Sequence, residues 1–410
     1  MEDSTLKHSR AALAPEWQLL LCCGRLDLTA EQAAQLSALA PLVDWPRVLQ
    51  LAREHCLLPL VYRHLKTVCP ALVPPASLQT LHEQTQNNAV RAHYLAQLLV
   101  DILAQFQTAG LDVLPFKGPV LASLAYGKLS LRHYSDLDVL LPRADLARAE
   151  QVLLAQGFIS KHPDEPALST LDGQALPHHD PAYINADGVV LELHWALAPE
   201  SFGYPFAELH LWERTLEIQM LGQRVRVPSI ENQLLLACFN ATKELWWRLE
   251  HLATLAQLIR AQPQLDWDYV LEVAARTRQR RVVLLGLLLA EAWFDAPLPA
   301  PVQALWQNEP ELLELARAIH AILFNRDDIA TRSTNTHFFR WRLCDRRRDK
   351  ALYLLRHIFQ SGSSTPLPWW HAAWRSVRRL GSLHYRRGWP FLTQIARAWL
   401  ARKSATRTAS

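Results

Sequence analysis

The sequence has few cysteines and little net charge. Its 43 Lys and Arg residues nearly balance its 39 Asp and Glu residues, and a net charge of +4 is too small to indicate nucleic-acid binding by the whole protein. The six cysteines are scattered without the paired spacing of a zinc site or a disulfide framework: Cys22, Cys23, Cys56, Cys69, Cys238 and Cys344. We therefore expect neither a zinc-stabilised nor a disulfide-stabilised fold.

The sequence also lacks a long hydrophobic run and an internal repeat of fixed period. Its longest apolar run, Val282 to Ala290, is shorter than the roughly 20 residues that span a bilayer. The chain opens on Met1-Glu-Asp-Ser, which is acidic and polar, unlike a signal peptide. These features predict a cytoplasmic protein with no transmembrane segment.

What the sequence does contain is a globular composition. Half of the 410 residues are hydrophobic and a fifth are charged. A chain of this length can form two or three domains around a large core.

The stretch from Leu111 to Pro142 differs from the leucine-rich helical pattern around it. It predicts a strand at 111–116, a tight turn, a helix, and a second strand that carries Asp136 and Asp138. Side chains at i and i+2 of a strand point to the same side, so these two carboxylates face one spot. Their repulsion costs stability, and replacing Asp138 is expected to relieve it in the metal-free protein. A divalent cation removes the same cost, and Mg²⁺ is commonly held by one or two carboxylates together with substrate phosphates.

The turn before the helix suits a phosphate group. Gly118 allows close approach of the backbone, and Pro119 is favourable at the first helical position. The helix N-terminus offers free N–H donors to an anion. Lys117 adds a positive charge beside them.

A third acid lies in a later strand. Residues 189–195, Val-Val-Leu-Glu-Leu-His-Trp, alternate so that Glu192 and His194 share one face while Leu191, Leu193 and Trp195 share the other. Asp136, Asp138 and Glu192 are thus a candidate set of three metal-binding carboxylates.

The sequence resembles the bacterial uncharacterised nucleotidyltransferase family in the order of its motifs. These are Phe-Lys-Gly, Leu-Ala, Tyr, Arg and Asp-Leu-Asp in 116–138, followed by Glu-Leu-His-Trp in 192–195. This family is a branch of the DNA polymerase β-like nucleotidyltransferase superfamily. Lys117-Gly118 stands where the superfamily usually has Gly-Ser. The catalytic motifs of the resemblance extend from about Ala109 to Trp195.

The resemblance implies an α+β fold with a small mixed β-sheet core flanked by extensive N- and C-terminal helical regions. It implies transfer of a nucleoside monophosphate from an NTP to an acceptor hydroxyl, with Mg²⁺ or Mn²⁺ as cofactor. Asp136, Asp138 and Glu192 are the implied metal-binding and catalytic residues. The implied nucleotide-binding residues are Lys117, Gly118, Arg132 and Lys243. The acceptor, whether a small molecule, a protein or RNA, is not indicated by the sequence.

Helical patterns predict the parts on either side of this core. Thr29-Ala-Glu-Gln32 has the form of a capping box, a long helix is expected from Ser77 to about Thr108, and Ser229 is a predicted N-cap. We predict four regions: N-terminal helices at 1–108, a catalytic core at 109–228, a helical domain at 229–323 and a basic, Trp-rich helical tail at 324–410. On the helix after the core, a set of residues about one turn apart is predicted to contact the base or the acceptor, or else to form an ordinary polar face: Asn240, Lys243, Glu244, Trp247 and Arg248.

Other functions remain open from the sequence alone. A nucleotidyltransferase fold can serve as a non-catalytic scaffold or regulatory binding module, since a fold does not determine function. The tail interleaves arginines with tryptophans, a pattern suited to RNA or a weak anionic-surface contact. His178, His179 and His194 do not have the spacing of a short zinc motif.

Overall fold

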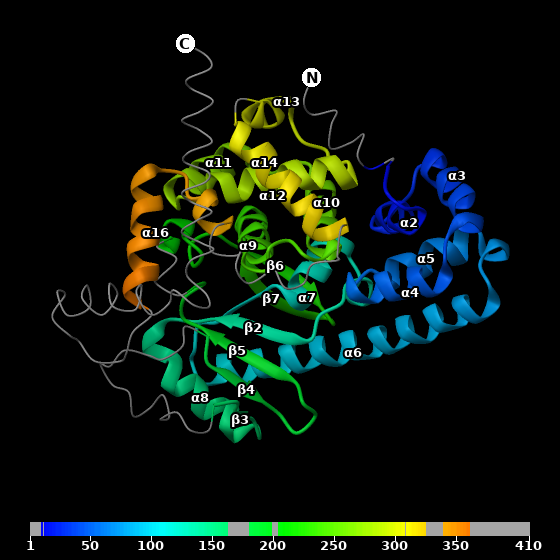
Figure 1. Cartoon of the computed structure of the whole chain (residues 1–410). Coiled ribbons are helices and arrows are strands. Elements are labelled where there is room, and N and C mark those ends of the chain that lie inside the picture. Colours follow the sequence, from blue (N-terminus) through cyan, green and yellow to red (C-terminus); the bar gives the residue numbers. More distant parts are fainter. Residues whose placement is uncertain are drawn as a thin grey trace, which may run out of the picture.

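The computed structural model describes residues 10, 12–162, 180–198, 204–307, 309–324 and 339–360. It confirms the predicted α+β class, with a small mixed sheet between helical regions (Figure 1). The N-terminal helices are α2 Pro15–Cys23, α3 Ala30–Leu39, α4 Trp45–Glu54, α5 Leu58–Val68 and α6 Pro75–Thr108. The core elements are β1 Leu114–Phe116, α7 Gly118–Leu121, β2 Asp136–Leu140, α8 Leu146–Ala155, β3 Ile159–Ser160, β4 Ala182–Ile184, β5 Val190–His194, β6 Thr215–Met220 and β7 Gln223–Pro228. The C-terminal helices are α9 Ile230–Lys243, α10 Leu249–Ala261, α11 Trp267–Arg276, α12 Arg280–Phe294, α13 Ala300–Gln303, α14 Pro310–Phe324 and α16 Arg347–Gln360. None of these helices is long and apolar enough to cross a membrane.

The main sheet has five strands in the order β1-β2-β5-β4-β3. Only the central pair, β2 and β5, is parallel, and the other neighbours are antiparallel. Strands β6 and β7 form a separate two-stranded antiparallel sheet. The two parallel strands therefore lie at the middle of the sheet, where their side chains have neighbours on both sides.

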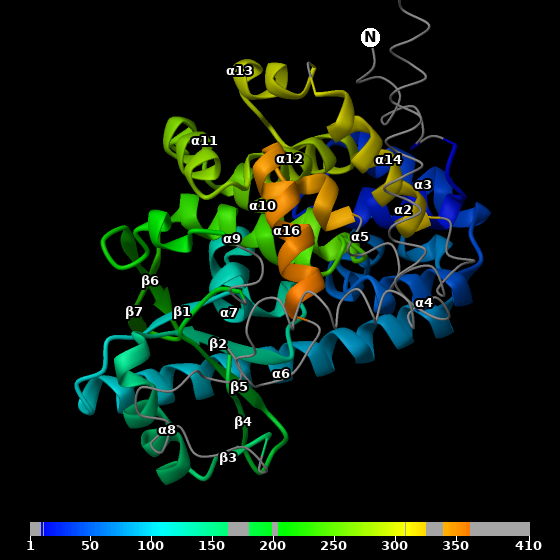
Figure 2. The same cartoon turned by 60° about the vertical axis from the view of Figure 1, so that its left-hand side comes forward.

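One face of the main sheet is apolar and fully covered. Leu137 and Val139 of β2 and Leu191 and Leu193 of β5 have no exposed surface. They belong to a hydrophobic core that also contains residues of α6 and α8, and Figure 2 shows α6 running along the sheet. The alternation of a strand then directs Asp138, Glu192 and His194 to the opposite face.

Helix α6 ends in a Schellman motif that delivers the chain into the sheet. Gly110 has φ of +66°, its N–H donates to the Gln107 carbonyl, and the Leu111 N–H donates to the Phe106 carbonyl. Strand β1 consequently begins at Leu114, so the predicted strand start at Leu111 is wrong. Leu111 completes the helix cap instead, and residues 112–113 connect it to β1.

A second hydrophobic core joins the two ends of the described chain. It contains residues of α2 to α6 together with residues of α9 to α14. The Trp17 and Phe324 rings, for example, meet edge to face at 5.0 Å between centroids. The predicted capping box at Thr29 and Gln32 and the N-cap at Ser229 are confirmed. The region boundaries themselves stay predictions.

Two features of 215–248 differ from the sequence prediction. Strand β6 was not predicted, although the residues of Thr215–Met220 alternate between polar and apolar types. The polar face through Lys243 and Arg248 is wrong, since α9 ends at Lys243 and Leu245 and Trp246 have φ of +56° and +55°. This turn buries the Trp246 side chain completely.

Candidate functional site

The pairing of β2 with β5 brings two of the predicted acids together. The register places Asp138 beside Glu192 and Leu140 beside His194. Asp138 is 3% exposed, whereas the Glu192 side chain retains 27% of its surface. One carboxylate is therefore held inside the protein and the other can reach solvent or a ligand.

His194 links the two carboxylates. Its Nε2 lies 2.9 Å from Asp138 Oδ1 and 3.2 Å from Glu192 Oε2. Its ring also meets the Phe116 ring edge to face, with centroids 5.1 Å apart. The imidazole is thus fixed in position by both the sheet and the acids.

Lys117 supplies a cation to the same oxygen. Its Nζ donates to Asp138 Oδ1 at 2.5 Å, and the lysine side chain is 24% exposed. Its backbone has φ of +58° and ψ of −146°, a region that costs a side-chain-bearing residue about 1–3 kcal/mol. Gly118 follows at φ of +26° and starts α7. Glycine adopts positive φ without strain, so a glycine at position 117 would avoid this cost.

These contacts change the electrostatics expected from the sequence. Burial acts to raise the pKa of Asp138, but Lys117 and His194 together hold that pKa well below its usual range. Burial also acts to raise the pKa of Glu192, but the hydrogen bond and charge of His194, together with the charge of Lys117, lower it overall. Internal cations thus neutralise this pair of acids, and Asp138 is stabilised in its charged form rather than destabilised by repulsion.

Asp136 has a different environment. It lies two residues earlier in β2, is half-buried, and has a pKa raised by burial and by the charge of Asp138. Lys117 only partly offsets these effects. Asp136 is the member of the set for which mutual repulsion is the dominant charge interaction.

Arg132 contacts the turn that opens α7 but forms its ion pair with a residue of another helix. Its Nε is 2.6 Å from Glu250 Oε1 of α10, and its Nη1 lies 3.4 Å from the Gly118 carbonyl oxygen. Thr254 also donates to Glu250 Oε1 at 2.9 Å. The guanidinium therefore connects α10 to the turn that opens α7.

Lys243 at the end of α9 is half-buried near the acids. Burial and the charge of Lys117 lower its pKa, while Asp180, Glu192 and Asp138 act in the opposite direction. Its carbonyl accepts a hydrogen bond from Arg340 at 2.8 Å. His178, His179 and most of the basic, Trp-rich tail lie outside the described residues.

The arrangement fits a divalent cation. One ligand atom each from Asp138, Glu192 and His194 lie within 4.8 Å of one another, a spacing that a single ion can bridge. Carboxylate oxygens suit Mg²⁺ or Mn²⁺, whereas the imidazole is better suited to orienting its two carboxylate neighbours. Asp136 is not one of these three residues, although its carboxylate interacts with Asp138 and Glu192.

The sequence missed Glu250, which is 5% exposed and pairs with Arg132. Nothing in the helical pattern of α10 distinguishes this glutamate from a surface residue. The sequence placed His194 on the same face as Glu192. Its contacts with both acids could be recognised only from the register between β2 and β5.

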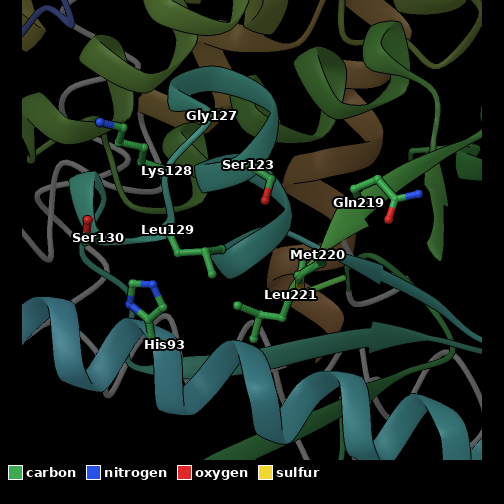
Figure 3. A pocket seen from close by; sticks show the side chains of 9 residues that line it. All are labelled: His93, Ser123, Gly127, Lys128, Leu129, Ser130, Gln219, Met220 and Leu221. Carbon is green, nitrogen blue, oxygen red and sulfur yellow. The ribbon is translucent and has the colours of Figure 1, made fainter. Parts of the chain in front are cut away.

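A cavity of about 330 Å³ lies away from these acids, between α6, the segment 123–130 and the β6–β7 turn. Figure 3 shows its lining side chains, including His93, Lys128 and Leu221. None of the predicted site residues lines it. The candidate site is therefore defined by the face of β2 and β5 and not by this hollow.

Comparisons with known proteins identify a family for the chain. No curated protein matches the chain. Among solved structures, an antigenic nucleotidyltransferase-like protein from Paracoccidioides brasiliensis is 19% identical, with 49% of this chain and 97% of that chain covered and a TM-score of 0.28. The model of a family described as uncharacterised nucleotidyltransferase matches residues 41–295, which is more than half of the sequence. This chain belongs to the uncharacterised nucleotidyltransferase family.

Proposed function

We propose that the protein transfers a nucleoside monophosphate from an NTP to an acceptor hydroxyl and releases pyrophosphate. The observation that carries this proposal is the convergence of Asp138, Glu192 and Lys117 on one face of the sheet, beside the turn that opens α7. Carboxylates from paired strands next to a helix N-terminus can serve both a metal ion and a triphosphate.

A Mg²⁺ or Mn²⁺ ion held by Asp138 and Glu192, with Asp136 beside them, would neutralise the charge that develops on the phosphates. Lys117 and the backbone N–H groups at Gly118 would hold the β- and γ-phosphates, with Lys243 adding positive charge. Arg132 would act by fixing the turn, because its guanidinium already contacts Glu250 and the Gly118 carbonyl.

The transfer forms a bond between the acceptor oxygen and the α-phosphorus and breaks the bond from that phosphorus to pyrophosphate, which leaves with the electron pair. Glu192 would accept the proton of the acceptor hydroxyl, since its carboxylate is ionised and partly exposed. His194 would hold Glu192 and Asp138 in place through its Nε2 contacts.

A second candidate is a non-catalytic module that keeps the nucleotidyltransferase fold. The specific observation in its favour is the Lys117 ammonium on Asp138, which neutralises the buried acid without a metal. In this case the acids and the lysine would be a structural ion pair. Metal-dependent nucleotide binding distinguishes the two candidates.

We expect purified protein to bind at least one of the four NTPs only when Mg²⁺ is present, as measured by isothermal titration calorimetry. Asp136→Asn should weaken this binding by at least about tenfold, the scale of losing a group near a metal. Asp101→Asn, the same change on the exposed side of α6, should have no effect. NTP affinity that is equal with Mg²⁺ and with EDTA would favour the non-catalytic module.

Lys117→Gly is expected to have opposite effects on the two ligands. Without the ammonium on Asp138 Oδ1, Mg²⁺ should bind more tightly, because no internal cation competes for the carboxylate. NTP should bind more weakly, because a phosphate contact is lost. Titrations of Mg²⁺ alone and of Mg²⁺ with NTP measure the two effects. Weaker binding of both ligands would argue against competition between Lys117 and the metal.

A further inference from the structure

A second cavity, of about 340 Å³, lies where α4 and α5 approach α6 and the link that precedes β2. Its size is within the range of small-molecule sites. Leu58 and Pro59 line part of its wall. Its polar lining comes from three separate segments: Arg53, Gln84, Asn87, Asn88, Arg91 and His133.

The cavity has positive charge without an acidic partner. No Asp or Glu is among its lining residues, and within the described part of the chain neither Arg53 nor Arg91 pairs with a carboxylate. Arg91 donates to the Ser135 carbonyl at 3.2 Å. Burial raises the pKa of Cys56, which also lines the cavity, to about 11, so its thiol is neutral. An anion would therefore meet two guanidinium groups in the lining, while the charges of Glu250 and Arg132, which both act on Cys56 and His133, oppose one another behind the wall.

Polar groups in the wall are oriented, and one buried acceptor lacks a partner. Asn88 donates from Nδ2 to the Ser130 carbonyl at 2.9 Å, and its Oδ1 lies 3.0 Å from His133 Nδ1, which fixes both side chains. Gln84 Oε1 is buried and has no hydrogen-bond partner among the described residues. A buried acceptor of this kind is normally satisfied, and a ligand hydroxyl can supply the donor.

We propose that this cavity binds a small hydroxylated phosphate monoester, with its phosphate between Arg53 and Arg91 and a hydroxyl donating to Gln84. Guanidinium groups match phosphate oxygens in geometry and charge. Arg91 holds the carbonyl of Ser135, the residue before Asp136, so the bound ligand lies beside the start of β2. The proposal does not depend on nucleotidyl transfer.

The test uses the full chain in EDTA, with ribose 5-phosphate, inorganic phosphate and ribose titrated separately by calorimetry. Ribose 5-phosphate should bind saturably and more tightly than inorganic phosphate, and ribose should not bind. Arg53→Gln should weaken ribose 5-phosphate binding by at least about tenfold, the effect of one lost hydrogen bond to a charged group. Arg47→Gln, on the same helix but bonded to Gln50 outside the cavity, should not change it.

Gln84→Leu tests the hydroxyl contact separately. It should reduce the preference for ribose 5-phosphate over inorganic phosphate while leaving the affinity for inorganic phosphate unchanged. The proposal is overturned if no phosphate compound binds saturably, or if Arg53→Gln and Arg47→Gln have the same effect. Equal affinities for ribose 5-phosphate and inorganic phosphate in the wild type would also overturn it, because the cavity would then recognise an anion alone.

Discussion

Asp138→Asn is expected to destabilise the metal-free protein by about 3 kcal/mol, at the low end of the range for removing one partner of a buried ion pair, because Lys117 is partly exposed. The substitution leaves the Lys117 ammonium and the buried His194 without the charge that both now contact. This reverses the expectation from the sequence, in which replacing Asp138 relieves repulsion. The free energy of unfolding, measured by urea denaturation in EDTA, tests it.

Asp136→Asn is the matched comparison and should act in the opposite direction. Burial and the charge of Asp138 raise the pKa of Asp136, so its ionised form costs stability at neutral pH. Its replacement should therefore stabilise the metal-free protein. Equal destabilisation by both substitutions would contradict the assignment of Lys117 to Asp138.

The difference between wild type and Asp138→Asn should also depend on pH. Asp138 has a folded-state pKa below its unfolded value, so its contribution is present above about pH 4 and is lost as the pH falls below that value. Unfolding curves at pH 7 and pH 3.5 should show the difference shrinking. Under the proposed function, Asp136→Asn and Asp138→Asn should both weaken metal binding, although they change stability in opposite directions. Metal binding and stability therefore test the proposal and the ion pair separately.

Glu250→Gln and Arg132→Gln should each destabilise the protein by about 3–5 kcal/mol, because each leaves the other charge buried without its partner. Both side chains are largely buried, at 6% and 12% exposure. Thr254 donates to the same glutamate oxygen that Arg132 contacts, so Glu250→Gln also weakens a hydrogen bond to a charged acceptor. These are large effects for single substitutions.

A double-mutant cycle measures the pair itself. The double variant should be less destabilised than the sum of the two single variants, since no unpaired charge remains. Glu272→Gln is a suitable control, because Glu272 pairs with Arg276 on the exposed surface of α11 and should change stability by no more than about 1 kcal/mol. Additive effects of Arg132 and Glu250 would show that the two groups do not interact.

The same pair should influence the nucleotide site. Arg132 contacts the Gly118 carbonyl, so Arg132→Gln should loosen the turn that presents Lys117 and weaken NTP binding. Glu250 does not contact that turn in the described contacts, and Glu250→Gln should affect NTP binding only through Arg132. If Glu250→Gln acts only through Arg132, the double variant should bind NTP no more weakly than Arg132→Gln alone. A further loss of affinity in the double variant would contradict this.

Local signals in the sequence predicted the framework of the site. The alternation in 136–140 and 190–194 placed the acids on one face and the leucines on the other, because successive side chains of a strand point to opposite sides. The capping residues Thr29 and Ser229 marked helix starts through their side-chain chemistry. The α+β class was implied by the family resemblance.

Predictions were less accurate where tertiary packing overrides local preference. The helix through Lys243 ends early because burial of Trp246 selects a turn with positive φ. Strand β6 was missed although its residues alternate between polar and apolar types, and its place in the fold depends on its pairing with β7. Lys117 adopts a strained backbone that its residue type disfavours, and its bond to Asp138 offsets that strain.

By itself, the sequence determined which residues carry charge, which faces they occupy and which family the chain resembles. Only the tertiary structure decided how the charges pair: Lys117 with Asp138, His194 with both acids, and Arg132 with Glu250 of a distant helix. The reason is physical, since side-chain alternation is a property of a few consecutive residues, whereas an ion pair depends on how separate elements pack. That packing changes Asp138 from a carboxylate expected to be repelled by its neighbours into one that internal cations stabilise.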